Sequence, residues 1–168
     1  HRMEVGIVNV TGYAGSELAR LLLRHPEVRV TSVTGRSAVG QKLGEFFPHL
    51  REMDLTIGEQ LDEVDIAFAA LPHQASAEAI VPMLEAGQRV IDISADFRLN
   101  DPRLYDQWYG FTHPAPGLLA EAVYGLVELN RPRIAAARLV AAPGCYPTSA
   151  ILALTPALRA GIIGTDII

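Results

Sequence analysis

Residues 4–34 read EVGIVNVTGYAGSELARLLLRHPEVRVTSVT, and the order of elements in this stretch decides the fold. The segment 4–10 is short and rich in Val and Ile, which predicts a buried strand. After a glycine turn, the pattern indicates a helix from the capping residue Ser16 to His25, which suits a last helical turn. The β-branched segment 28–34 predicts a second strand. Strand, glycine turn, helix and strand form a βαβ unit, whose crossover makes the two strands parallel.

The same alternation continues along the chain. Further strands are expected over 64–71, 89–93 and 138–142, helices over 75–86 and 148–159, and a Pro- and aromatic-rich loop over 94–120. We therefore predict a doubly wound, mostly parallel, Rossmann-like α/β sheet. We assign residues 3–142 to this domain and residues 143–168 to the truncated start of a second, α+β domain.

Composition restricts the class of protein. The chain has 168 residues, a net charge of −5, 49% hydrophobic residues and 20% charged residues, which is typical of a globular domain. The acidic balance argues against a nucleic-acid partner, and no apolar stretch is long enough to span a membrane. A single cysteine fits a reducing cytoplasm. The apolar, strand-like run 164–168 has no terminating signal, so we expect the chain to be a fragment.

A glycine loop, Thr11-Gly12-Tyr13-Ala14-Gly15, follows the first strand. Its glycines would let the backbone approach a pyrophosphate that rests on the helix N-terminus, and the alternative is merely a tight turn. The second strand ends in Thr34-Gly35-Arg36-Ser37, where NAD enzymes usually carry an acid. The cation of Arg36 and the hydroxyl of Ser37 favour the 2′-phosphate of NADP. The alternative is that Arg36 is one more solvated surface charge.

The only cysteine, Cys145, follows the strand expected over 138–142 and a Pro143-Gly144 turn. It lies at or just before a helix N-terminus, where unpaired backbone N–H groups and the helix dipole favour a thiolate. The residues alone leave two interpretations open. Cys145 is either a nucleophile or an inert small hydrophobe.

Other candidates follow the strands expected over 64–71 and 89–93, at the sheet edge where ligands bind. Ser76 is expected to be a helix N-cap first and a ligand contact second, and His73 is either a cofactor contact or a histidine tied into the turn. Arg98 could bind a carboxylate or phosphate bidentately. Equally, Asp96 and Arg98 could form a local ion pair that fixes the loop.

On five motifs the chain resembles the N-acetyl-γ-glutamyl-phosphate reductase family. These motifs run in the family's order over residues 11–18, 70–73, 94–99, 124–126 and 143–148. The resemblance implies NADPH-dependent reduction of an acyl phosphate in arginine biosynthesis, with no metal, in a cytoplasmic homo-oligomer whose second domain serves catalysis and dimerisation. It implies that Cys145 is the nucleophile. It also implies that the Gly12–Gly15 loop binds the cofactor. Together with the positions at the strand ends, we predict the cofactor contacts Thr11, Gly12, Tyr13, Ala14, Gly15, Arg36, Ser37, Leu71, Pro72, His73 and Ser76, and the substrate contacts Ser94, Arg98, Pro143 and Gly144.

The chain departs from the family pattern at four positions. Asn9 and Gln74 stand where glycine is common, Val127 where proline is usual, and Ser149 where Ala or Gly is usual. All four changes are small or local, so they bear on fine specificity rather than on the class of reaction.

The family's catalytic histidine lies past residue 168. We therefore expect this chain to bind NADPH without turning over, and turnover would point instead to His73 or His113 as the base.

The implied chemistry is formation of a Cys145 thioester, hydride transfer from NADPH and release of N-acetylglutamate semialdehyde. One alternative is the same chemistry on an aminoadipyl phosphate in lysine biosynthesis, because one methylene changes only pocket depth. The others are a non-catalytic NADP-sensing module and a dehydrogenase without covalent catalysis.

Overall fold

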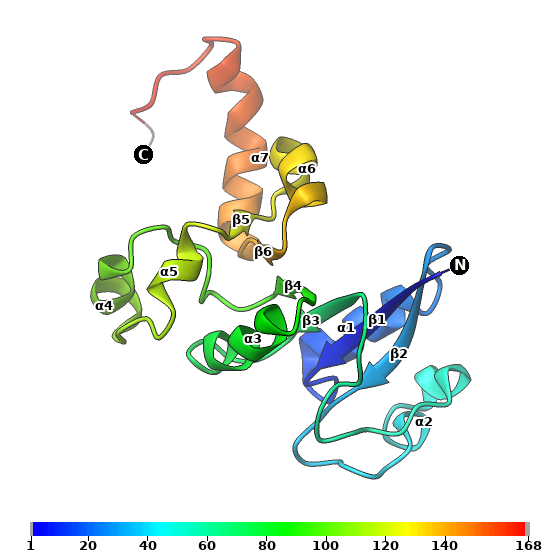
Figure 1. Ribbon diagram of the computed structural model, residues 1–168. Helices are drawn as coiled ribbons and strands as arrows, with labels where there is room; N and C mark the ends of the chain where they lie inside the picture. The colour runs from blue at the N-terminus through cyan, green and yellow to red at the C-terminus, as the bar shows by residue number, and fades with distance from the viewer. Residues whose placement is uncertain (1, 167–168) are drawn as a thin grey trace.

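The computed structural model describes residues 2–166, which build a six-stranded sheet with parallel pairing throughout (Figure 1). Its spatial order is β2-β1-β3-β4-β6-β5. The strands are β1 (Met3–Val8), β2 (Val28–Val33), β3 (Ile66–Ala69), β4 (Arg89–Asp92), β5 (Val123–Tyr124) and β6 (Leu139–Ala141). The helices are α1 (Tyr13–Leu22), α2 (Leu43–Phe46), η1 (Pro48–Met53, a 3-10 helix), α3 (Ala75–Glu85), α4 (Arg103–Tyr109), α5 (Pro116–Leu119), α6 (Val127–Ala136) and α7 (Cys145–Arg159). The predicted parallel, Rossmann-like α/β architecture is confirmed.

The strand order reverses at β1, because the chain places β2 on one side of β1 and β3 on the other. In open parallel sheets such a switch point leaves a crevice outside the carboxyl ends of the two central strands. The segments that follow β1 and β3 therefore border this crevice, and the glycine loop is one of them.

The first βαβ unit forms as expected, but its boundaries differ. Strand β1 ends at Val8, because Asn9 adopts φ 63° and leaves the extended conformation. Helix α1 begins at Tyr13 with Gly12 as its N-cap, so the prediction that Ser16 caps the helix is wrong. The Ser16 hydroxyl lies inside the first turn and donates to the Tyr13 carbonyl at 3.1 Å. His25 lies beyond the helix, where its Nδ1 accepts the Glu27 N–H.

Two apolar clusters pack against the sheet. One contains Ile7 of β1 together with residues of α1, α2 and β2. The other contains Ala67 and Ala69 of β3 with residues of α3 and α4. Because side chains alternate between the faces of a strand, Gly6 points opposite to Ile7, and a Cβ on Gly6 would meet Leu61 and Val64. The sheet thus separates the two clusters into two layers.

The segment 94–120 is not a continuous loop. It contains α4 and α5, which close around the aromatic rings of Phe97, Tyr105, Phe111 and His113. Strand β5 and helix α6 are further elements that the sequence pattern did not predict. All four are short or interrupted by proline, and α6 has no buried residue, so none carries a clear apolar period.

Helix α7 begins at Cys145, three residues earlier than expected, and projects away from the sheet (Figure 1). None of its residues is buried. The strand-like run expected over 164–168 lies partly outside the described residues. Within residues 2–166, no helix combines the length and apolar character needed to cross a membrane.

Candidate active site

The glycine loop is built by a close approach of α1 to the end of β1. The Asn9 side chain donates Nδ2–H to the Ala70 carbonyl at 2.9 Å, which ties the loop to the end of β3. A Cβ on Gly15 would lie 2.3 Å from the Asn9 carbonyl oxygen, so only glycine fits there. No side chain caps the N-terminus of α1. Its first backbone N–H groups therefore suit an anion such as a pyrophosphate.

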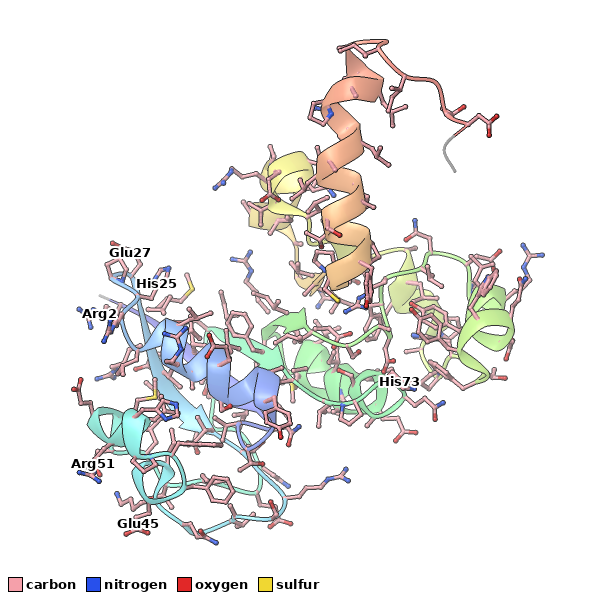
Figure 2. All side chains as sticks on the ribbon, turned by 180° about the vertical axis from the view of Figure 1, so that it is seen from behind. Arg2, His25, Glu27, Glu45, Arg51 and His73 are labelled. Carbon is pink, nitrogen blue, oxygen red and sulfur yellow. The ribbon has the colours of Figure 1, made fainter. Side chains whose placement is uncertain are left out.

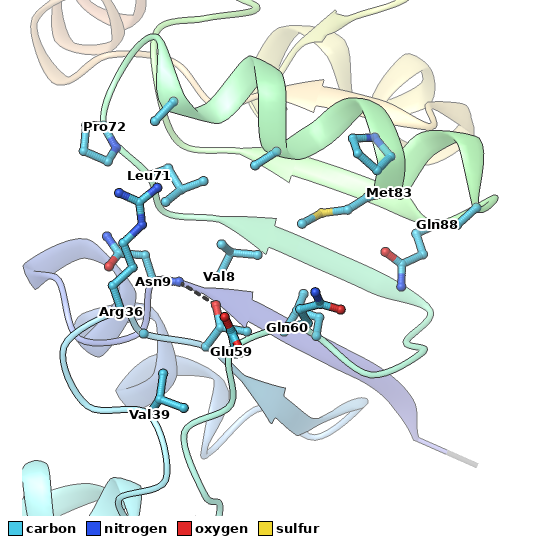
Figure 3. A pocket seen from close by; sticks show the side chains of 17 residues that line it. Val8, Asn9, Arg36, Val39, Glu59, Gln60, Leu71, Pro72, Met83 and Gln88 are labelled. Atoms are coloured by element: carbon cyan, nitrogen blue, oxygen red, sulfur yellow. Dashed lines mark hydrogen bonds between the residues drawn. The ribbon is translucent and has the colours of Figure 1, made fainter.

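A cavity of about 880 Å³ opens beside this loop at the switch point (Figure 3). Its wall includes Asn9 after β1, Gly35 and Arg36 after β2, and Leu71 and Pro72 after β3. The Arg36 side chain extends across the opening toward Leu71 and Pro72 (Figure 3). The size and the cation suit the adenosine half of a dinucleotide.

The other predicted cofactor residues lie outside the wall of this cavity. Gly12 and Gly15 shape the loop itself, and Thr11 packs against Gly35, where an added Cβ would lie 2.7 Å from Thr11 Cγ2. The remaining side chains, other than Ser76, are solvent-exposed: Tyr13, Ala14, Ser37 and His73. His73 lies on the turn before α3, at 6.3 Å between ring centroids from Tyr109 (Figure 2).

Ser76 is not an N-cap, because α3 begins at Ala75 with Gln74 as its N-cap. Ser76 is fully buried and donates its hydroxyl to Asp92 Oδ1 at 2.6 Å. Asp92 also accepts the Ser94 N–H at 3.0 Å and the Ser94 hydroxyl at 2.7 Å. Burial raises the pKa of Asp92, and the hydrogen bonds from Ser76 and Ser94 oppose this rise by stabilising the carboxylate.

Of the two interpretations of Arg98, the local ion pair with Asp96 does not form within the described residues. Asp96 is fully buried, and its two carboxylate oxygens accept the backbone N–H groups of Gln74 at 2.8 Å and Ala77 at 2.9 Å. Arg98 instead donates Nε–H to the Ala142 carbonyl at 2.8 Å and Nη2–H to the Ile93 carbonyl at 3.0 Å. The sequence placed both residues at a strand end but gave no signal for these partners.

The candidate thiol lies at the end of β6, two strands from β3 in the sheet. Cys145 is exposed and is the first residue of α7, with Gly144 as the N-cap and no side-chain cap. A Cβ on Gly144 would lie 3.1 Å from Arg98 Nη1. The structure thus brings three of the predicted substrate residues together, Arg98, Pro143 and Gly144, whereas Ser94 is buried against Asp92.

His113 does not have a free ring nitrogen. It is buried, with Nε2 at 2.6 Å from the Asp96 carbonyl oxygen and Nδ1 accepting the Ala115 N–H at 3.1 Å. Both ring nitrogens therefore hold the backbone of the segment 96–115. Within residues 2–166, no group of three or more His, Cys, Asp and Glu side chains could hold a metal ion.

Known proteins resemble this chain over nearly all of its length. The chain is 62% identical, over 96% of its length, to an N-acetyl-gamma-glutamyl-phosphate reductase of Dehalococcoides mccartyi (strain CBDB1), of which it covers 48%. It is 49% identical, over 98% of its length, to a protein of Thermomicrobium roseum named putative [LysW]-L-2-aminoadipate 6-phosphate reductase, again covering 48% of that protein. The chain thus spans about half the length of the curated relatives it matches.

Solved structures share the fold. Aspartate semialdehyde dehydrogenase II of Vibrio cholerae superposes with a TM-score of 0.67 at 22% identity, over 95% of this chain and 47% of that one. Residues 4–137 match the family described as "Semialdehyde dehydrogenase, NAD binding domain". The chain therefore belongs to the semialdehyde dehydrogenase family and carries its NAD-binding domain.

Proposed function

We propose that this chain is the cofactor-binding part of an NADPH-dependent N-acetyl-γ-glutamyl-phosphate reductase of arginine biosynthesis, with Cys145 as its nucleophile. One observation carries the proposal. An exposed thiol forms the first residue of α7, at the same sheet edge as the glycine loop, in a chain 62% identical to a reductase of that name.

The residues around Cys145 suit nucleophilic attack on an acyl phosphate. The Cys145 thiolate adds to the acyl carbon, the bond from that carbon to the phosphate oxygen breaks, and phosphate leaves with its electron pair. The N-terminal backbone N–H groups of α7 can donate to the oxyanion of the tetrahedral intermediate. Arg98 is held in place through Nε and Nη2, so Nη1 beside Gly144 is the donor left for an anionic group of the substrate.

The glycine loop and the cavity beside it suit a nicotinamide dinucleotide. The open N-terminus of α1 would hold the pyrophosphate, and Arg36 would hold the 2′-phosphate that distinguishes NADP from NAD. When bound, NADPH supplies the hydride that reduces the thioester carbonyl. The carbon–sulfur bond then breaks, which releases the semialdehyde and returns the Cys145 thiolate.

A general base is needed to activate the thiol, and His113 cannot take this role while both its ring nitrogens are hydrogen-bonded. Because the family resemblance also places the catalytic histidine past residue 168, we propose that residues 1–168 alone bind NADPH but do not turn over. Turnover by residues 1–168 would instead identify His73 as the base.

The test uses the intact protein that carries this chain. Cys145→Ser is expected to lower kcat by at least about 10³-fold, because a hydroxyl is a far weaker nucleophile than a thiolate. Ser149→Ala, one turn along the same exposed helix, is the matched control and should keep kcat within about twofold. NADPH should be preferred to NADH, and Arg36→Ala should remove that preference. A Cys145→Ser enzyme that retains most of its activity would exclude covalent catalysis.

The second candidate substrate is an aminoadipyl 6-phosphate, which the name of the Thermomicrobium roseum relative raises. The higher identity to the reductase from Dehalococcoides mccartyi favours the glutamyl compound. The ratio of kcat/KM for the two substrates decides between them. One methylene is worth about 10- to 200-fold, so a ratio above about 10 in favour of either compound identifies the substrate.

A further inference from the structure

The loop from Asp92 to Arg98 contacts both halves of the proposed site. We propose that Asp96 and Arg98 are positioning residues, which fix the cofactor-side turn before α3 and the turn that carries Cys145 to one common loop. This inference rests on the proposed function, because the spacing of the two turns matters only if one binds the cofactor and the other carries the nucleophile. The measurements that test it do not require turnover.

Asp96 holds the cofactor side. Helix α3 has no capping side chain of its own, and the Asp96 carboxylate replaces one by accepting N–H groups from the N-cap residue Gln74 and from Ala77. A buried carboxylate is costly unless such bonds compensate it, and the positive end of the helix dipole adds to them. The start of α3 is therefore fixed to residue 96, and with it the turn of Leu71 and Pro72 that borders the cavity.

Arg98 holds the thiol side. Its planar guanidinium donates to the Ala142 carbonyl, three residues before Cys145, and to the Ile93 carbonyl within the loop itself. The Ala142 N–H in turn donates to the Asp92 carbonyl at 2.8 Å. The ammonium group of a lysine cannot reproduce these two hydrogen bonds, because the two carbonyls lie in fixed directions around one planar guanidinium.

The loop between these two residues is itself held rigidly. The buried Tyr105 hydroxyl donates to the Ala95 carbonyl at 3.1 Å and accepts the Leu99 N–H at 3.0 Å. The Ser94 hydroxyl accepts the Asp96 N–H at 3.0 Å, and His113 Nε2 lies 2.6 Å from the Asp96 carbonyl oxygen. A loop fixed at so many points keeps the cofactor-side turn and the thiol turn at a constant separation, which matters because hydride transfer tolerates little misplacement.

Two variants of the intact protein test this role without substrate. In Asp96→Asn, the side-chain amide N–H faces a backbone N–H from which Asp96 accepted a hydrogen bond. In Arg98→Lys, the positive charge is kept, but the paired hydrogen bonds to the Ala142 and Ile93 carbonyls are lost. We expect each to slow iodoacetamide alkylation of Cys145 at pH 7 by about two- to fivefold. The turn 142–144 is then no longer held in place, so the first turn of α7, whose N–H groups favour the thiolate, loses order. Asp96→Asn should also raise the Kd for NADPH about tenfold, measured by cofactor fluorescence.

Ser32→Ala is the matched control, because Ser32 is another buried side chain whose oxygen accepts a backbone N–H, that of Asp62 at 3.0 Å. It should lose stability yet keep the alkylation rate and the NADPH Kd within about twofold of wild type. If folded Asp96→Asn and Arg98→Lys proteins match this control, the positioning role is wrong. Arg98→Lys keeps the test decisive if Asp96→Asn does not fold. If an active Cys145→Ser enzyme contradicts the proposed function, the alkylation rate and the NADPH Kd still test the positioning role, because neither measurement requires turnover.

Discussion

Asn9 and Gln74 are non-glycine residues with positive φ, at 63° and 71°. The family resemblance implies that glycine is common at both positions. Side chains with a Cβ are strained in this region, and asparagine tolerates it better than most. Asn9 also gains a hydrogen bond to the Ala70 carbonyl. Gln74 has ψ −40° as well, which is the conformation of a rare, strained turn, and the Asp96 carboxylate holds it there through its N–H.

Gln74→Gly is therefore expected to raise the free energy of unfolding by about 1 kcal/mol, which is the relieved strain less the added chain entropy of glycine. Its backbone N–H still reaches Asp96, so the cap on α3 is retained. Urea denaturation measures the change. Gln88→Gly is the matched control, because Gln88 has no positive φ and should lose stability instead. A Gln74→Gly protein no more stable than Gln88→Gly would contradict this account.

At the scale of elements, the contact between β1 and α1 depends on the absence of a side chain at Gly15. Gly15 lies directly against the Asn9 carbonyl, and this close contact brings the N-terminus of α1 to the loop that is proposed to hold the pyrophosphate. This contact joins two elements of the βαβ unit and shapes the cofactor site at the same time.

Gly15→Ala should push α1 away from the end of β1, since its Cβ would lie 2.3 Å from the Asn9 oxygen and 2.8 Å from Val10 Cα, both backbone atoms. We expect a loss of about 2 kcal/mol in unfolding free energy and a weaker NADPH complex. Calorimetry and cofactor titration would measure the two effects. Gly117→Ala, where a Cβ meets nothing within 4 Å, should leave the NADPH complex unchanged and raise the unfolding free energy slightly, because alanine has less chain entropy to lose than glycine in helix α5. Equal behaviour of the two variants would refute the steric argument.

At the scale of the whole molecule, Asp92 joins β4, α3 and the loop that follows β4 in one buried hydrogen-bonded group. Burial raises the pKa of Asp92 above its ordinary value of 3.8, so the folded protein keeps this proton to higher pH than the unfolded chain does. The cost of ionising Asp92 therefore accumulates as the pH rises from 3.8 through the raised value, and it is relieved as the pH falls.

Wild type is expected to gain stability relative to Asp92→Asn as the pH falls through the raised pKa of Asp92 toward 3.8, measured as the difference in urea unfolding free energy. The comparison cancels the titration of groups common to both proteins. Asp101→Asn provides the opposite sign at lower pH. The hydrogen bond from Arg103 lowers the pKa of Asp101, so wild type loses its advantage only as the pH falls below the ordinary value of 3.8 toward the lowered pKa. A pH-independent difference for Asp92→Asn would show that its burial has no energetic effect.

Several features followed from local sequence because they rest on local physics. The period of the apolar residues in 4–34 predicted the βαβ unit, and the position of Cys145 after a Pro-Gly turn predicted its place at a helix N-terminus. The boundaries were less accurate. Helix α1 is capped by Gly12, four residues before the expected cap Ser16, and α7 begins three residues before its expected start, because Gly12 and Gly144 cap these helices with extended backbone rather than with a side chain.

The sequence by itself determined the parallel α/β fold, the glycine loop and the position of the thiol at a helix end, because periodicity, turn residues and caps act over a few residues. Only the tertiary structure decided what Ser76, Asp96, Arg98 and His113 contact. The Ser76 hydroxyl, the Asp96 carboxylate and carbonyl, and the Arg98 guanidinium have partners 5 to 44 residues away along the chain, most of them on other elements. Such pairings depend on how strands and helices pack in space, and no local pattern encodes that distance.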